Sequence, residues 1–242
     1  MLRFDISQEY KGNGVSQGLN RGLLVYANDR LIVEEGMGLG ACAVRTGGYT
    51  YFTSVRSIQK TGALIEVVCS IDLTQEVTVW GIKSKLIPKA QEYIVSAIYM
   101  KHKKTQKPIL ALWAFSRMIF RVQSRFVKVP QLGEVRIVYS PGSSEVRIDV
   151  SCSMEKPMSR FFVMNELGGS IFSKSIVDGR LSDPPCGWQK MDGPCELYSK
   201  DHSLAFTMEE KHIPEDVQSS LYWGREKVAG NCCWAGFESE IV

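Results

Sequence analysis

The sequence predicts an all-β protein, built as a large antiparallel β-sandwich or flattened barrel with at most one or two short helices. Three observations favour this class. Short runs of β-branched and aromatic residues recur between turn-forming residues, which is typical of strands. Few stretches show the apolar spacing of an amphipathic helix over about a dozen positions. No alternation of strand and helix appears, so a parallel sheet is not expected.

The first predicted strands cover residues 23–26, 63–69, 77–80 and 93–99. Between the first two lies a glycine-rich segment, residues 31–45, with glycines at 36, 38 and 40. A glycine loop that cradles phosphate must open a helix. Residues 41–54 instead read as strand, turn, strand, with the turn at Gly47-Gly48. We therefore expect the glycines to shape a connection between strands.

The clearest predicted hairpin joins residues 134–139 to residues 145–150, because both runs alternate apolar and polar side chains around the turn Ser140-Pro-Gly-Ser-Ser144. The pattern places apolar residues of the first run on one face and those of the second on the facing one. They are Val135, Ile137 and Tyr139, then Val146, Ile148 and Val150.

Two segments are ambiguous between helix and strand. Residues 109–129 begin with good helix formers and continue with a strand-like alternation, and we favour strands over a short helix. Residues 214–221 begin with proline and two acids, which suits the first turn of a short helix. The basic run 101–107 lies between apolar segments, where a solvated hairpin tip is expected rather than a phosphate or RNA site.

Length and charge limit the classes of function. We expect one β domain over residues 1–242, with a division near residues 128–133 as the alternative. The net charge of +3 is too small to predict a nucleic-acid-binding protein. Residues 1–7 lack the apolar core of a signal peptide, and no apolar run is long enough to span a membrane. We therefore expect a cytoplasmic protein without nucleic-acid or membrane partners, its oligomeric state left open.

The seven cysteines predict neither a disulfide framework nor a metal site. The odd number leaves one thiol over, and no pair has the CxxC spacing. Cys42, Cys69 and Cys152 lie in strand-like runs and should be small buried apolar residues. Zinc bound by downstream thiols and imidazoles is the weaker alternative, with spacings unlike those of short zinc motifs. Its candidates are Cys186, Cys195, His202, His212, Cys232 and Cys233. We expect no metal and no cofactor.

The catalytic candidates surround the glycine segment. Glu34 and Glu35 precede the glycines, and Arg45 and Tyr51 follow across the turns, so an acid, a base and a phenol would converge if the strands pair. Adjacent residues of a strand point to opposite faces, so both glutamates cannot face one pocket without a bulge. This set predicts a lyase, isomerase or hydrolase.

The aromatic residues predict a different function, the binding of a small organic ligand such as a carbohydrate or a lipid-like molecule. Trp188, Trp223, Trp234 and Tyr49 are the candidates for lining a cleft. We favour ligand binding over the enzyme, with a structural or assembly module as a third alternative. Residues 232–241 alternate as a final strand that joins a sheet.

Overall fold

The computed structural model describes residues 2–6, 18–33, 38–84, 86, 106–168, 171–177, 180–182, 189–191, 195–200, 203–208, 217–226 and 232–241. Antiparallel strands dominate this part of the chain and form sheets of three, eleven and four strands, so the predicted all-β class is confirmed. Beside them lies one longer helix, α2 (Gln106–Ile119). No helix among the described residues is long and apolar enough to cross a membrane.

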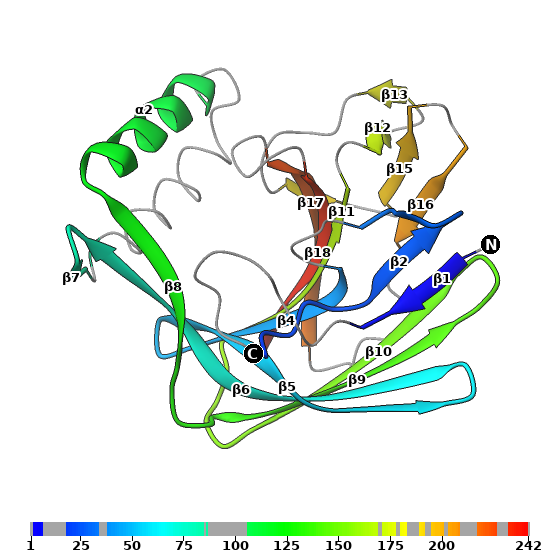
Figure 1. The fold of residues 1–242 in the computed structure, drawn as a ribbon, viewed down its shortest axis with the longest axis horizontal. Helices are drawn as coiled ribbons and strands as arrows, with labels where there is room; N and C mark the ends of the chain where they lie inside the picture. Colours follow the sequence, from blue (N-terminus) through cyan, green and yellow to red (C-terminus); the bar gives the residue numbers. More distant parts are fainter. Residues whose placement is uncertain are drawn as a thin grey trace.

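The largest sheet has the strand order β10-β9-β6-β5-β4-β11-β18-β17-β14, and β7 and β8 also pair with β6. Its strands are β4 (Leu39–Thr46), β5 (Tyr49–Thr61), β6 (Leu64–Val79), β7 (Ile82–Lys83), β8 (Val122–Lys128), β9 (Gly133–Pro141), β10 (Val146–Met154), β11 (Arg160–Leu167), β14 (Gln189–Met191), β17 (Val217–Glu226) and β18 (Cys232–Ile241). The sheet curls, so that β17 and β18 rise steeply from the layer of β5, β6, β9 and β10 (Figure 1).

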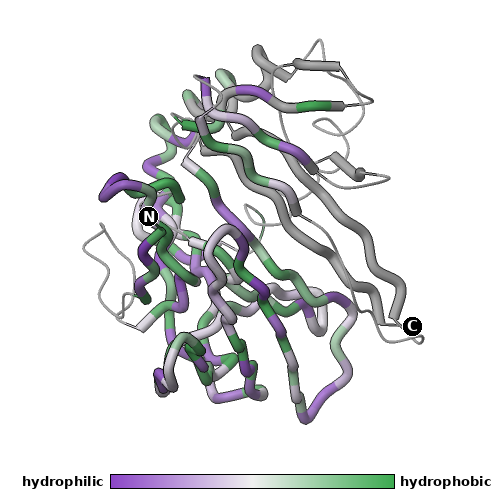
Figure 2. Tube along the Cα trace, turned by 90° about the vertical axis from the view of Figure 1, so that its right-hand side faces the viewer, coloured by the Kyte–Doolittle hydropathy of each residue, from purple (hydrophilic) through white to green (hydrophobic). Residues whose placement is uncertain are grey.

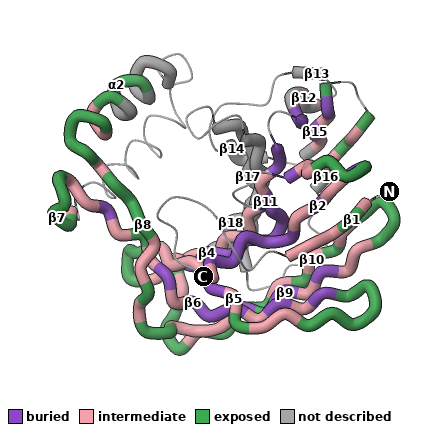
Figure 3. The backbone as a smooth tube through the Cα atoms, in the orientation of Figure 1, coloured by how far each residue is buried: buried purple, intermediate pink, exposed green. Residues whose placement is uncertain are grey.

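Two smaller sheets complete the described fold. The first contains β1 (Leu2–Asp5), β2 (Leu24–Ala27) and β3 (Arg30–Leu31), and the second contains β12 (Phe172–Val177), β13 (Arg180–Ser182), β15 (Cys195–Ser199) and β16 (Ala205–Met208). One hydrophobic cluster draws side chains from all three sheets, including Val25 of β2, Ile137 of β9 and Leu197 of β15. Buried residues accordingly follow β4, β6 and β9 and reach β2 (Figure 3).

The predicted hairpin is confirmed as β9 and β10, with Ile148 opposite Tyr139 and Val150 opposite Ile137. Val135, Ile137 and Tyr139 are fully buried, and the partners on β10 are partly buried against the same cluster. Alternation of apolar and polar residues is visible along the described strands in Figure 2. The Gly47-Gly48 turn is confirmed as well, because both glycines have left-handed backbone between the paired strands β4 and β5.

Several other sequence-based predictions have clear outcomes. Residues 109–119 belong to α2, so the preference for strands there is wrong, whereas residues 122–128 do form a strand, β8. The short helix expected over 214–221 is also wrong, since residues 217–221 begin β17, which pairs with β18 along its whole length. The final strand is confirmed as β18. The predicted strand over 93–99 lies outside the described residues, and because 106–119 is helical, the basic run does not lead into a second strand.

Strand β6 is the longest and changes partners along its length. Residues Leu64–Thr74 pair with β5, and Ile65–Ser70 pair with β9 on the other side. From Leu73 to Val79 the strand pairs with β8 and then also with the short β7. Since β8 and β9 both pair with β6, the chain stays in one sheet across residues 128–133; the single-domain organisation remains a prediction.

Candidate functional site

Gly22 and Gly38 lie where residues 19–23 cross the beginning of β4. The Leu23 N–H donates to the Leu39 carbonyl at 2.7 Å, and the Leu39 N–H donates back at 2.9 Å. A Cβ added to Gly22 or to Gly38 would come within 3.0 Å of the carbonyl oxygen of Leu39 or Leu23, closer than real Cβ atoms approach. Glycine is therefore required at this crossing, and at positions 38 and 40 the prediction of a strand connection is confirmed.

Gly40 is fixed by contacts with two other strands. Its φ is +77°, and a Cβ there would lie 2.9 Å from the Tyr139 hydroxyl oxygen. The Tyr139 hydroxyl donates to the Leu39 carbonyl at 2.9 Å, and the Gly40 N–H donates to Asn165 Oδ1 at 2.8 Å. Burial raises the pKa of Tyr139, so its hydroxyl stays neutral and serves as a hydrogen-bond donor. We call residues 19–23 and 38–40 the glycine crossing.

Asn20, in the glycine crossing, has a buried side-chain donor without a hydrogen-bond partner. Its side chain is buried, with the residue 3% exposed, and its Oδ1 accepts the Gly22 N–H at 3.0 Å. Its own N–H donates to the Thr53 carbonyl at 2.7 Å. Nδ2 is buried and has no partner within the described structure. A buried donor without a partner is costly, so this atom marks a position where a ligand oxygen would be stabilising.

Other buried polar residues lie beside Asn20 in the chain or on the strand that faces it. Arg21 follows it and is also buried, with its carbonyl accepting the Gly38 N–H. Ser54, one residue along β5 from Thr53, donates its hydroxyl to Asp72 Oδ1 at 2.6 Å. We call Asn20, Arg21, Thr53 and Ser54 the Asn20 corner. It combines a neutral donor with a buried cation, a chemistry suited to a ligand that presents oxygen acceptors.

The sequence analysis missed the Asn20 corner. Leu19-Asn-Arg-Gly22 contains the residue types of an ordinary surface turn. The one local signal is that Leu19 and Leu23 enclose the polar pair on both sides, and the structure buries both leucines. Burial of Asn20 depends on β5 and the glycine crossing, which local composition does not reveal.

The structure does not bring Arg45 and Tyr51 together. Arg45 lies opposite Thr50 of β5 and Arg160 of β11, whereas Tyr51 lies opposite Val44. Because successive residues of a strand alternate between faces, Arg45 and Tyr51 occupy opposite faces of the sheet. Tyr51 shares its face with the buried Val44 and packs against the core cluster. Glu34 and Glu35, the predicted acids, lie outside the described residues.

The predicted ligand-binding aromatics are also dispersed where the structure describes them. Tyr49 is exposed beside the Gly47-Gly48 turn. Trp223 is in register with Ala235, and Trp234 is in register with Gly224, so the two tryptophans occupy opposite faces of the β17–β18 pair. Trp188 lies outside the described residues.

Among the cysteines, Cys42 and Cys69 are fully buried, as predicted, and Cys152 is partly buried. Burial raises the pKa of Cys69 to about 12 and that of Cys152 to about 11, and it raises the pKa of Cys42 as well. Neutral buried thiols are poor nucleophiles and poor metal ligands. No group of three potential ligands is close enough to hold a metal within the described ranges, and Cys186, His202 and His212 fall outside them.

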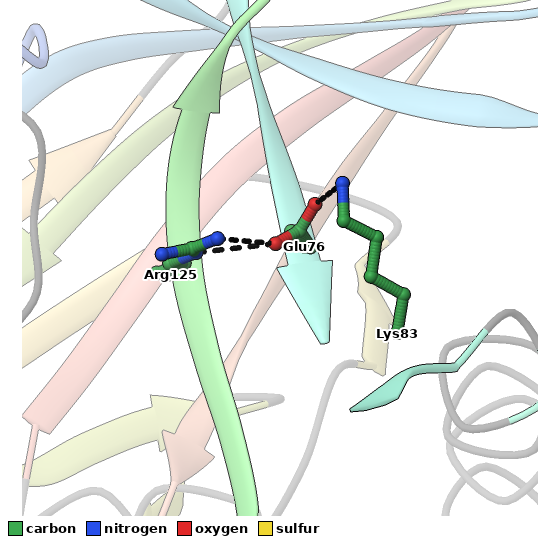
Figure 4. A network of polar contacts seen from close by, with 3 residues as sticks. All are labelled: Glu76, Lys83 and Arg125. Atoms are coloured by element: carbon green, nitrogen blue, oxygen red, sulfur yellow. Dashed lines mark hydrogen bonds and ion pairs between the residues drawn. The ribbon is translucent and has the colours of Figure 1, made fainter. Parts of the chain in front are cut away.

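Two carboxylates on β6 have shifted titration, and both shift downward. Hydrogen bonds from the Arg136 guanidinium lower the pKa of Glu66. Lys83 and Arg125 both contact Glu76 and lower its pKa, with Arg125 donating from Nε at 3.1 Å and from Nη2 at 2.8 Å to the same carboxylate oxygen (Figure 4). A general acid at neutral pH needs a raised pKa, so neither carboxylate fits that role.

Comparison with known proteins gives no assignment: no protein-family model, curated protein or solved structure matches this chain. The case for function therefore rests on the geometry alone.

Proposed function

We propose that the protein binds a small organic ligand, a carbohydrate or a lipid-like molecule, with a ligand oxygen accepting a hydrogen bond from Asn20 Nδ2. The observation that carries the proposal is the unpartnered, buried Nδ2 donor. A ligand oxygen at this atom would recover the hydrogen bond that folding leaves unmade. The neighbouring Arg21 adds a positive charge that favours a carboxylate or another oxygen-rich head group.

Asn165 shows what a structural asparagine looks like in the same molecule. Both asparagines are 3% exposed, and both accept a glycine N–H through Oδ1, from Gly22 at Asn20 and from Gly40 at Asn165. They differ at the amide nitrogen: of the two, the Asn20 Nδ2 is the one that is buried without a hydrogen-bond partner. The contrast supports a binding role at Asn20 beyond the backbone contact that both residues make.

The aromatic residues expected to line a cleft are dispersed where the structure describes them, so the proposal rests on Asn20 and its neighbours and not on an aromatic cleft. The cytoplasmic location expected from the sequence is proposed as well. It is supported by Cys42, Cys69 and Cys152, which are free thiols in the described part of the chain.

The test compares Asn20→Asp with its matched control Asn165→Asp. Both variants keep an oxygen that accepts the glycine N–H and remove the amide donor. Thermal unfolding of the full chain is followed with an oligosaccharide panel and a fatty-acid panel. We expect one panel to raise the Tm of the wild type, as a ligand that binds only the folded state does.

In Asn20→Asp the affinity should fall by about tenfold, the value of one hydrogen bond, and fall further for carboxylate ligands because of charge repulsion. Asn165→Asp should lower the Tm of the free protein and leave the affinity unchanged. An absence of stabilisation by either panel, or equal affinity of Asn20→Asp and wild type, would refute the proposal.

A further inference from the structure

We propose that the end of the molecule formed by α2, the β6–β7 turn and residue 120 docks on the surface of an anionic lipid bilayer. Its apolar members, which we call the α2 patch, are Trp80, Ile82, Leu112, Phe115, Met118, Ile119 and Phe120. The patch shares no residue with the Asn20 corner, so the two proposals stand or fall separately. The sequence-based expectation of no membrane partner rested on the lack of an apolar span, which surface docking does not need.

Exposed apolar side chains are concentrated at this end. Ten large apolar side chains are exposed in the described part of the chain, and seven of them belong to the α2 patch. Single exposed apolar residues are normal on a protein surface, whereas a contiguous group marks a site of interaction. We therefore expect this group of exposed apolar side chains to contact a partner.

The α2 patch is one connected surface rather than two. Leu112, Phe115 and Ile119 have the spacing that aligns side chains along one side of a helix. At the end of this row, the rings of Phe120 and Trp80 meet edge to face with centroids 5.4 Å apart. The Trp80 N–H also donates to the Phe120 carbonyl at 3.3 Å. These contacts join the helix end to the β6–β7 turn.

Trp80 is held at the tip of that turn by an unusual backbone. Its φ is +50°, followed by +82° at Gly81. A bulky residue rarely adopts a left-handed conformation, and turns of this kind favour asparagine or glycine. Tryptophan is enriched where proteins meet the interfacial region of a bilayer, because its ring is apolar and its N–H is polar. The tip therefore presents a side chain suited to a lipid surface.

The surroundings of the α2 patch carry a net positive charge. Residues 76–84, 86 and 106–128 contain six basic residues and one acidic residue, Glu76, and one of the six, Lys128, is paired with Asp72 just outside this range. Glu76 is already paired with Lys83 and Arg125, and its side chain is largely covered. Lys107, in the first turn of α2, is also the last residue of the basic run 101–107. Lysines and arginines around an apolar surface attract anionic head groups.

The positive charge distinguishes between two possible partners of the α2 patch, an anionic lipid surface and a second copy of the chain. A symmetric dimer through the α2 patch would place the same positive rim against itself, with no free acid among the described residues of the patch to offset it. An anionic bilayer neutralises the rim and accepts the apolar side chains without requiring a complementary shape. The charge thus favours the bilayer.

The experiment is flotation of the full-length protein with vesicles of phosphatidylcholine alone or of phosphatidylcholine mixed with phosphatidylglycerol. The wild type should float with the mixed vesicles, stay unbound with phosphatidylcholine alone, and lose binding as salt rises. Leu112→Ser should weaken binding by at least about tenfold, because the lost apolar contact is large. Arg121→Gln should weaken it by about fivefold.

The matched controls carry the same substitutions elsewhere. Leu64 is exposed beside the β5–β6 turn, and Arg147 is exposed on β10, so Leu64→Ser and Arg147→Gln should bind as the wild type does. Circular dichroism checks that every variant is folded. The proposal is overturned if the wild type fails to float with mixed vesicles, or if Leu112→Ser and Leu64→Ser behave alike. It is also overturned if sedimentation shows a dimer that Leu112→Ser dissociates while vesicles bind both forms equally.

Discussion

The two halves of β6 are built from similar residues and have opposite surroundings. In the first half, Ile71 is 0% exposed, and the strand is enclosed between β5 and β9. Beyond the second half, Ile82 is 73% exposed in β7, which continues from the same strand through the turn at Gly81. Of two isoleucines eleven residues apart, Ile71 therefore lies in the core and Ile82 is exposed to solvent. Tertiary contacts, rather than residue type, decide which apolar side chains are buried.

The difference teaches where function is to be sought. At the core half, apolar residues are satisfied, and the informative groups are polar ones, such as Asn20, that the core encloses. At the α2 half, the acid Glu76 is paired, and the informative groups are apolar ones left in solvent. We propose a ligand site at one end and a docking surface at the other.

The largest expected effect compares the two isoleucines. Ile71→Ala should lower the free energy of unfolding by about 4 kcal/mol, because it removes buried methylenes and leaves a cavity. Ile82→Ala should change it by less than about 0.5 kcal/mol. Urea denaturation followed by circular dichroism measures both. Similar losses in the two variants would show that the α2 half is packed as tightly as the core.

A second pair compares glycines. Gly38→Ala places a Cβ against the Leu23 carbonyl and should cost about 3 kcal/mol through overpacking. Gly81→Ala meets nothing within 4 Å and has only its left-handed φ of +82° to accommodate, so it should cost about 1 kcal/mol. The same denaturation experiment applies. A Gly38→Ala variant no less stable than Gly81→Ala would contradict the close crossing of residues 19–23 and β4.

The buried thiol of Cys69 predicts a dependence of stability on pH in the core half. Its pKa in the folded protein is about 12, above the ordinary value of 9.0, because of burial. The stability is fully present below pH 9. From pH 9 to pH 12 the unfolded chain ionises first, so unfolding becomes easier by about 1.4 kcal/mol per pH unit for this thiol. The slope should shrink in Cys69→Ala; an unchanged slope would assign it to other groups.

The smallest expected effects come from two carboxylates of β6. Glu66 is paired with Arg136 in the core half, and Glu76 with Lys83 and Arg125 in the α2 half. Both pKa values are lowered, so each pair stabilises the fold above the ordinary pKa of glutamate and loses that effect as the pH falls through the lowered value. NMR titration of the two carboxyls should show both below 4.5. A carboxyl of Glu76 that titrates at or above 4.5 would mean that its ion pairs do not form in solution.

The sequence predicts well where a pattern is local. The β9–β10 hairpin is clear because strict alternation and a turn cluster agree, and the Gly47-Gly48 turn is clear because glycine readily adopts the left-handed backbone of a two-residue turn. The pattern fails for α2, where apolar residues leave no clean period of 3.6 to distinguish a helix from a buried strand. It fails at residues 217–221 because pairing with β18 overrides the local signals for a helix.

The candidate sites also differ in whether local sequence predicts them. The role of the glycine segment could be predicted from its neighbours, since a strand rather than a helix follows it. The Asn20 corner and the α2 patch could not, because burial of a turn-like asparagine and exposure of a leucine-rich helix both depend on what the rest of the chain covers. Local sequence contains the residue types but not their surroundings.

Hydrogen–deuterium exchange of the full chain with and without anionic vesicles tests the contrast between the two halves most directly. We predict that vesicles slow exchange in residues 78–84 and 112–121 and leave residues 64–73 and 133–141 unchanged. Equal protection of both regions, or none in the α2 patch under conditions where the protein floats with vesicles, would contradict the claim that this exposed apolar end is the docking surface.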